Sequence, residues 1–85
     1  MRDVIVDVRE PEEYSSGHVK GAINLPLSKI NKEMVEANNI AGNDRIIVYC
    51  RSGNRSGLVL NKLNSWGYKN VINGINQSKV EAGLN

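Results

Sequence analysis

The stretch Arg45-Ile46-Ile47-Val48-Tyr49-Cys50-Arg51-Ser52-Gly53-Asn54-Arg55 contains the strongest strand signal of the chain and the loop that follows it. Apolar residues run without interruption from Ile46 to Cys50, which is typical of a strand covered on both faces of a sheet. After the loop, apolar residues at positions 58, 59, 60, 63 and 66 form a helical stripe, and Gly67 stands where a helix C-cap belongs. The stretch therefore predicts a strand, a loop and a helix, in that order.

Outward from this unit, strand and helix patterns alternate along the chain. We expect strands over residues 4–8, 21–26 and 70–73, and helices over residues 10–14, 28–36 and 78–82. Ser28 is the expected N-cap of the 28–36 helix, because a serine hydroxyl can accept a hydrogen bond from the first helical turn. The alternation predicts an α/β fold of three layers, with a mainly parallel central sheet and helices on both faces. Such sheets bind ligands at the carboxyl ends of their strands, which here means at Cys50.

The composition is that of a soluble globular domain. The chain has 85 residues, of which 40% are hydrophobic and 24% charged, so we expect one domain over residues 1–85 and exclude disordered and fibrous classes. The longest apolar run, residues 46–50, is far shorter than the roughly 20 residues of a membrane-spanning helix. Asp7 interrupts the N-terminal apolar run too early for a signal peptide. We expect no membrane association and a cytoplasmic location, or a periplasmic or other extracytoplasmic one if a leader has been removed.

Charge and cysteine content exclude further classes. A net charge of +2 is too small to indicate nucleic-acid binding. From Arg45 onward there are six basic residues and one acidic residue, so a small anion would be attracted to this half of the chain. One cysteine and one histidine exclude an internal disulfide and a Cys/His zinc cage. We therefore expect neither a metal nor a cofactor.

The loop after the central strand favours a reactive thiol. The following helix supplies unpaired backbone N–H groups and a positive dipole end, and Gly53 allows the loop to curl so that these groups point inward. Arg51 and Arg55 add positive charge nearby. A lone cysteine at the end of a strand is usually an inert apolar residue, but one with these neighbours is better explained as a nucleophile. The sequence predicts a lowered pKa for Cys50 and a thiolate that needs no general base.

Three separated motifs resemble those of the rhodanese-like sulfurtransferases. The first is the loop Cys50-Arg51-Ser52-Gly53-Asn54-Arg55, which closely resembles the active-site loop of that family. The second is an N-terminal signature: Asp7-Val8-Arg9, Glu13-Tyr14 and residues 17–26 (GHVKGAINLP). The third follows the active-site helix: Trp66-Gly67-Tyr68, Asn70-Val71 and Ala82-Gly83-Leu84. The resemblance covers nearly the whole chain and is strongest to the small single-domain bacterial type.

The chain departs from the family pattern near its C-terminal end. Many members carry paired glycines and a tryptophan before the Ala-Gly-Leu ending, whereas here Asn73-Gly74 precedes it and Ser78 or a neighbour stands in place of the tryptophan.

The resemblance implies a thiosulfate sulfurtransferase without a cofactor. Cys50 would be the catalytic residue, taking a sulfane sulfur from a small anionic donor such as thiosulfate to form a persulfide. It would then pass the sulfur to a thiophilic acceptor, cyanide or a thiol, including a thiol on a protein. The substrate-binding residues would be those of the loop: Arg51, Ser52, Gly53, Asn54 and Arg55. We expect the protein to be a monomer.

Four further residues are expected to support the loops around this site. Asp7 and Arg9 are interpreted as a structural ion pair or hydrogen-bonding pair, and His18 as a residue that fixes a loop by a hydrogen bond. Ser56 is expected to cap the helix and hold the loop. The acidic pair Glu12 and Glu13 is interpreted as part of a solvated helix face.

Other functions compete with the enzyme. A sulfur carrier loaded and unloaded by protein partners would use the same loop, and turnover with thiosulfate alone would distinguish the two. A regulatory rhodanese module is disfavoured because such modules often lack the cysteine. A cysteine phosphatase or arsenate reductase is also disfavoured. Phosphatase loops place five residues between Cys and Arg, whereas this loop places four, Arg51 to Asn54.

Overall fold

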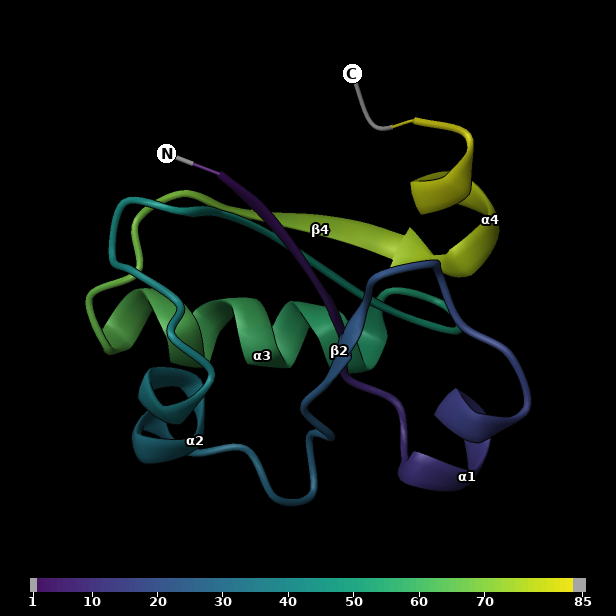
Figure 1. Cartoon of the computed structure of the whole chain (residues 1–85), viewed down its shortest axis with the longest axis horizontal. Helices are drawn as coiled ribbons and strands as arrows, with labels where there is room; N and C mark the ends of the chain where they lie inside the picture. The colour runs from purple at the N-terminus through teal and green to yellow at the C-terminus, as the bar shows by residue number, and fades with distance from the viewer. Residues whose placement is uncertain (1, 84–85) are drawn as a thin grey trace.

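The computed structural model describes residues 2–83, in which strands and helices alternate along the chain (Figure 1). The elements are β1 (Asp3–Asp7), α1 (Pro11–Ser15), β2 (Ile23–Asn24), α2 (Lys32–Ala37), β3 (Arg45–Cys50), α3 (Asn54–Ser65), β4 (Val71–Asn76) and α4 (Gln77–Glu81). None of the helices in residues 2–83 has the length and apolar content needed to span a membrane.

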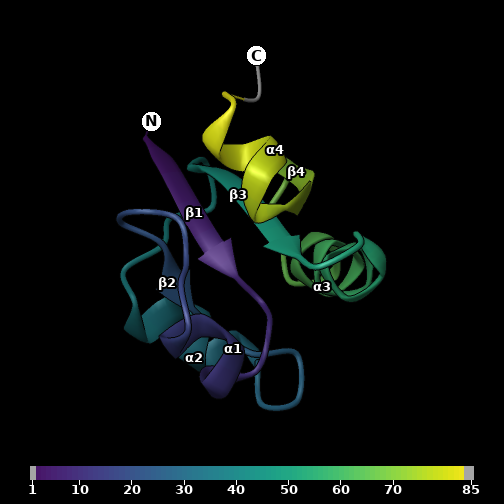
Figure 2. The same cartoon turned by 90° about the vertical axis from the view of Figure 1, so that its right-hand side faces the viewer.

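The strands form one parallel sheet in the order β2-β1-β3-β4. Figure 2 shows β1 and β3 side by side and pointing the same way. β3 is a central strand, and its residues from Ile46 to Cys50 are all buried, which explains the unbroken apolar run. Because all strands are parallel, their carboxyl ends meet at one edge, where Asp7 pairs with Tyr49 and Cys50 with Asn76.

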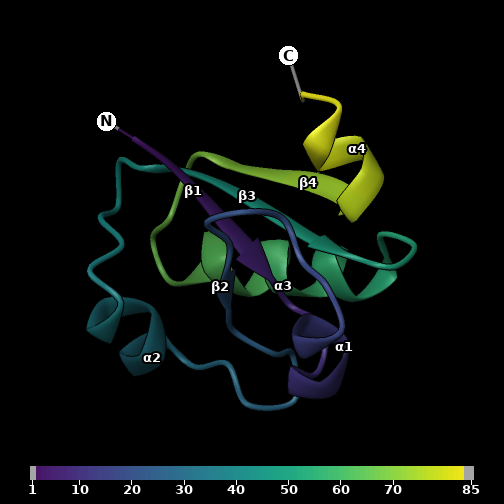
Figure 3. The same ribbon diagram turned by 45° about the vertical axis from the view of Figure 1, so that its right-hand side comes forward.

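Helices cover both faces of the sheet, as predicted. The larger core cluster lies on the face of α2 and α3, where Val35, Val59 and Leu63 pack against residues of β1 and β3. The smaller cluster lies on the opposite face, where Val80 of α4 packs with Tyr49 and with the segment around Val19. Figure 3 shows α3 and α4 on opposite sides of β4. The predicted three-layer α/β fold is confirmed.

Helix α2 begins later than predicted. The expected N-cap, Ser28, lies in a turn and donates a hydrogen bond to the Glu10 carboxylate at 2.7 Å. The cap is Asn31, whose side-chain oxygen accepts from the Met34 N–H at 2.8 Å. The 28–36 helix is thus corrected to Lys32–Ala37, because asparagine three residues further on provides an equally good cap while Ser28 has a partner elsewhere.

Strand β4 is longer than the predicted 70–73 strand and contains an irregularity. Val48 pairs with Asn73 but Tyr49 pairs with Ile75, so Gly74 is the extra residue of a β-bulge. Ile75 has a φ of 75°, an unfavourable value for a β-branched residue. The bulge bends β4 close to the edge of the sheet where Cys50 lies.

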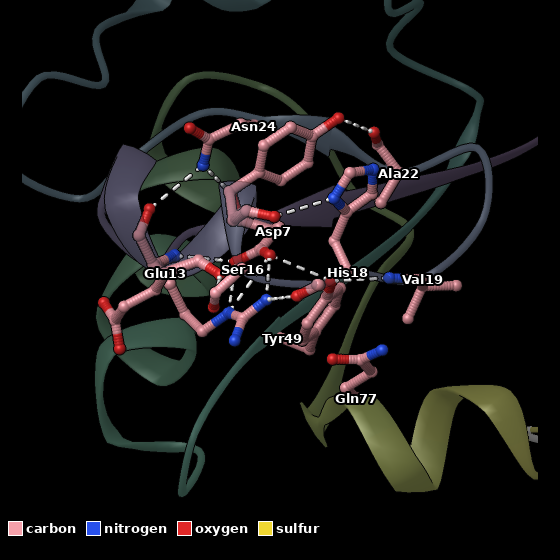
Figure 4. Close-up of polar contacts among 12 residues, drawn as sticks. Asp7, Glu13, Ser16, His18, Val19, Ala22, Asn24, Tyr49 and Gln77 are labelled. Carbon is pink, nitrogen blue, oxygen red and sulfur yellow. Dashed lines mark hydrogen bonds and ion pairs between the residues drawn. The ribbon is translucent and has the colours of Figure 1, made fainter.

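A buried carboxylate ties the ends of β1 and β3 together (Figure 4). Asp7 is fully buried and accepts hydrogen bonds from the Arg9 guanidinium at 2.7 Å and from the Tyr49 hydroxyl at 2.9 Å. The Tyr49 oxygen in turn accepts from the Val19 N–H at 3.0 Å. Burial, followed by the hydrogen bond to Asp7, raises the pKa of Tyr49 to about 12, so the phenol keeps the proton that it donates. The ion pair expected between Asp7 and Arg9 is present.

Replacing Asp7 tests this network. Asp7→Ala leaves the nearly buried Arg9 guanidinium without its carboxylate, and we expect the free energy of unfolding in urea to fall by about 3 kcal/mol. The matched control is Asp3→Ala, which removes a 57% exposed partner of Arg45 and should cost less than about 1 kcal/mol. Equal losses in the two variants would contradict a special role for the buried pair.

Candidate active site

Cys50 is the last residue of β3 and lies directly before the loop that leads into α3. Its side chain is buried on the face covered by α3, with 2% of its surface exposed. The loop turns back at Gly53, the N-cap of α3, whose φ of 93° is in the left-handed region that favours glycine. The turn brings the first N–H groups of α3 toward the cysteine sulfur.

The Cys50 sulfur occupies the position of a capping group at the start of α3. Gly53 N–H donates to Sγ at 3.1 Å, Ser56 N–H donates at 3.5 Å, and the Ser56 hydroxyl lies 3.5 Å away. Burial raises the pKa of Cys50, but the hydrogen bonds that the thiolate form accepts from the Ser56 hydroxyl and from the backbone N–H groups of Ser56, Ser52 and Gly53 outweigh it. Together they lower the pKa to about 7. The site can therefore hold a large fraction of thiolate near neutral pH.

The two arginines of the loop have different surroundings. Arg55 donates two hydrogen bonds to the Glu13 carboxylate, at 2.7 and 3.0 Å, and the ion pair joins α3 to α1. This pairing lowers the pKa of Glu13 to about 2. Arg51 is exposed. Glu13 is thus part of the site, contrary to the solvated helix face expected for it. The thiolate is stabilised mainly by hydrogen bonds rather than by the charges of the two arginines.

The remaining loop residues surround the sulfur with backbone. Ser52 and Asn54 have exposed side chains, and Asn54 is the first residue of α3. They contribute to the site through the course of the backbone rather than by contacts of their side chains with the sulfur. The loop groups directed at the sulfur are therefore mainly backbone N–H donors, a type of group that can hold an anion.

His18 and its neighbours hold the segment after α1. The His18 Nδ1 atom lies 2.8 Å from the Tyr14 carbonyl oxygen, and the two rings stack with their centroids 3.7 Å apart (Figure 4). The Tyr14 hydroxyl donates to the Ala22 carbonyl at 2.8 Å. Arg9, besides pairing with Asp7, donates to the Gly17 carbonyl at 2.7 Å. These contacts fix the segment that packs over the second face of the sheet.

Ser56 and Asn73 form a second contact between the loop and β4. Ser56 is fully buried in the first turn of α3, where Gly53 is the cap, so its predicted capping role is wrong. Its hydroxyl donates to the Asn73 side-chain oxygen at 2.7 Å, and the Asn73 amide donates to the Gly53 carbonyl at 3.0 Å. Sequence reasoning placed Asn73 at the end of the expected 70–73 strand and missed its place in the site, because no spacing linked it to Cys50.

Residues 2–83 contain no group of three His, Cys, Asp or Glu side chains that could hold a metal ion. The described groups that meet at the site are one thiol, its hydrogen-bond donors and the charges around it.

The sequence and the fold are similar to those of known proteins. The chain is 43% identical over 68 residues to the thiosulfate sulfurtransferase PspE of Escherichia coli, covering 80% of this chain and 64% of that protein. It is 41% identical over 69 residues to YrkF of Bacillus subtilis, a candidate sulfur carrier, covering 81% of this chain and 36% of that protein. A solved rhodanese with anions from E. coli superposes with a TM-score of 0.80 at 36% identity, covering 91% of this chain and 89% of that one.

The chain thus spans less than two thirds of the length of these two curated relatives. The match to the family itself is broader, because the model of the rhodanese-like domain matches residues 1–76, from before β1 to the end of β4. With a parallel sheet, a cysteine at the end of its central strand and a loop of backbone donors around the sulfur, this chain belongs to the rhodanese-like domain family.

Proposed function

We propose that the protein is a thiosulfate sulfurtransferase in which Cys50 carries the transferred sulfur as a persulfide. The observation that carries this proposal is the position of Cys50 Sγ among the N–H groups at the start of α3, with a pKa of about 7. Such a sulfur is a nucleophile at neutral pH and needs no separate base.

The reaction proceeds by two displacements. The Cys50 thiolate attacks the outer sulfur of thiosulfate, a sulfur–sulfur bond forms, and sulfite leaves with the electron pair of the broken bond. Cyanide or a thiolate then attacks the outer sulfur of the persulfide, and the Cys50 thiolate is released. In both steps the negative charge stays on or next to the cysteine sulfur, where Gly53 and Ser56 N–H groups stabilise it.

The loop arginines have separate tasks in this proposal. Arg51 is exposed beside Cys50 and attracts the dianionic donor from solvent. Arg55 is held by Glu13, and it anchors the start of α3 to α1 so that the backbone donors keep their direction. Ser52, Gly53 and Asn54 complete the loop around the outer sulfur.

A sulfur carrier is the second candidate function. The observation that favours it is the similarity to YrkF, a candidate sulfur carrier, over 81% of this chain. A carrier would use the same persulfide on Cys50 but would receive and deliver sulfur through protein partners. The presence of Cys50 disfavours a third candidate, a regulatory module without chemistry.

Sulfur loading tests the proposed enzyme. After treatment with thiosulfate, we expect the intact mass to rise by one sulfur atom, and cyanide to remove it as thiocyanate. Cys50→Ser is the control and should gain no sulfur, because its hydroxyl is not ionised at neutral pH. No gain of mass by the native protein would contradict thiosulfate as donor, and loading only by a protein persulfide would favour the carrier.

The pH dependence of alkylation tests the ionisation of Cys50. With a pKa of about 7, the rate with iodoacetamide should rise with pH, reach half its plateau near neutrality and level off above it. The rate rises because the thiolate is the reacting form and its fraction grows as pH passes the pKa. A midpoint at the ordinary thiol value, about 8.5, would show that the hydrogen bonds do not stabilise the thiolate.

Gly53 tests the curl of the loop. In Gly53→Ala, the alanine would have to adopt a φ of 93°, which is unfavourable for a residue with a side chain, and its Cβ would lie 3.4 Å from Ile75. The substitution should therefore move the residue 53 N–H away from the sulfur. We expect sulfur transfer to slow by about tenfold to a hundredfold, the worth of a hydrogen bond to a charged group. Gly57→Ala is the matched control, since Gly57 lies inside α3 and its Cβ would make an ordinary 3.6 Å contact with the Asn73 side-chain nitrogen of β4. Equal rates in the two variants would contradict the role of Gly53.

A further inference from the structure

The Asn73 side-chain amide has only one orientation that satisfies its neighbours. Its oxygen faces the Ile75 backbone N–H at 3.0 Å, and its nitrogen faces the Gly53 carbonyl oxygen at 3.0 Å. Turning the amide over would place a donor against a donor and an acceptor against an acceptor. Because both partners are backbone groups of fixed polarity, Oδ1 and Nδ2 are assigned by the chemistry of their surroundings.

This orientation determines where the Ser56 hydroxyl proton points. Ser56 Oγ lies 2.7 Å from Asn73 Oδ1, which is an acceptor, so the hydroxyl donates to Asn73. The same oxygen lies 3.5 Å from Cys50 Sγ. A hydroxyl has one proton, so while Ser56 donates to Asn73 it presents lone pairs to the sulfur. Ser56 is fully buried, so its partners come from the protein.

We propose that Asn73 is a positioning residue that opposes the ionisation of Cys50 by holding the Ser56 hydroxyl away from the sulfur. In the thiol form, Cys50 S–H donates to Ser56 Oγ, and Ser56 donates to Asn73. When Cys50 loses its proton to solvent, the hydroxyl turns to donate to the thiolate. Asn73 Oδ1 then keeps the Ile75 N–H as its donor. The hydroxyl thus exchanges one acceptor for the other as the sulfur changes charge.

The bulge of β4 makes this arrangement stable. Gly74 is the extra residue, and Ile75 is held at φ 75° with its N–H directed at the side chain of Asn73. The Ile75 N–H is the donor that remains on Asn73 when Ser56 turns away. Asn73 Oδ1 therefore loses one of its two hydrogen-bond donors and keeps the other, so the free-energy cost of the exchange is small.

Charged groups around the thiol do not change in this exchange. Arg55 interacts with the charge of Cys50 and is paired with Glu13 of α1, and Arg51 lies in the loop next to the cysteine. β4 has no ionisable side chain, and at the end of β1 Asp7 is paired with Arg9. Replacing Asn73 or Ser56 with alanine removes no charge, so a change in the pKa of Cys50 would report hydrogen bonding.

A double-mutant cycle tests the proposal. The pKa of Cys50 is measured from the pH dependence of iodoacetamide alkylation in the native protein, Asn73→Ala, Ser56→Ala and the double variant. Asn73→Ala also removes the hydrogen bond from Asn73 to Gly53. The effect of this loss on the pKa of Cys50 is the same with or without the Ser56 hydroxyl, so it cancels in the cycle. Two pKa changes of Cys50 are compared: the change that Asn73→Ala causes when Ser56 is present, and the change that it causes when residue 56 is alanine. We expect the first to be more negative than the second by about half to one pKa unit. The same change in both backgrounds, or the opposite sign, would overturn the proposal.

A second measurement leaves Asn73 in place. The carbon resonance of the Asn73 side-chain carbonyl is followed by NMR as pH crosses the alkylation midpoint. We expect it to titrate with Cys50 in the native protein, because Oδ1 loses the Ser56 hydroxyl, and to stay flat in Ser56→Ala and Cys50→Ser. A flat resonance in the native protein would overturn the proposal. The proposal rests on the proposed function only in taking Cys50 as the reactive group, and neither measurement uses a sulfur donor, so the two can fail separately.

Discussion

The carboxyl edge of the sheet depends on the hydrogen bonds that the buried Asp7 carboxylate accepts. This carboxylate receives the Arg9 guanidinium and the Tyr49 hydroxyl, so it ties the end of β1 to β3 one residue before Cys50. Tyr49 also accepts the Val19 N–H and so anchors the segment over the second face. A buried charge is tolerated only when its hydrogen bonds are satisfied. The position at which Cys50 leaves the sheet is therefore closely defined.

From that position, the chemistry of Cys50 results from two opposing effects. Burial disfavours the thiolate, and hydrogen bonds from the start of α3 favour it strongly enough to bring the pKa to about 7. These donors keep their direction because the loop is held from two sides. Glu13 of α1 binds Arg55, and Asn73 of β4 binds Gly53 and Ser56. The charged residue Arg55 thus supports the donors in place of acting as the main partner of the sulfur.

Local patterns were enough to predict the order of strands and helices, and they failed where a residue had a distant partner. The apolar run of residues 46–50 is a buried central strand, as its composition indicated. Ser28 and Asn31 are both good caps, and the choice of Asn31 followed from the contact of Ser28 with Glu10. The expected 70–73 strand ends at Asn73, but β4 continues to Asn76 because a bulge accommodates Gly74.

The sequence by itself determined the α/β class, the position of the thiol after the central strand and the glycine that lets the loop curl. These features depend on hydrophobic periodicity and on backbone conformation, which neighbouring residues control. Only the tertiary structure decided that Glu13 forms an ion pair with Arg55, 42 residues away, and that Asn73 accepts a hydrogen bond from Ser56, 17 residues away. Such pairs depend on strand register and on helix packing across the sheet, which no local pattern encodes.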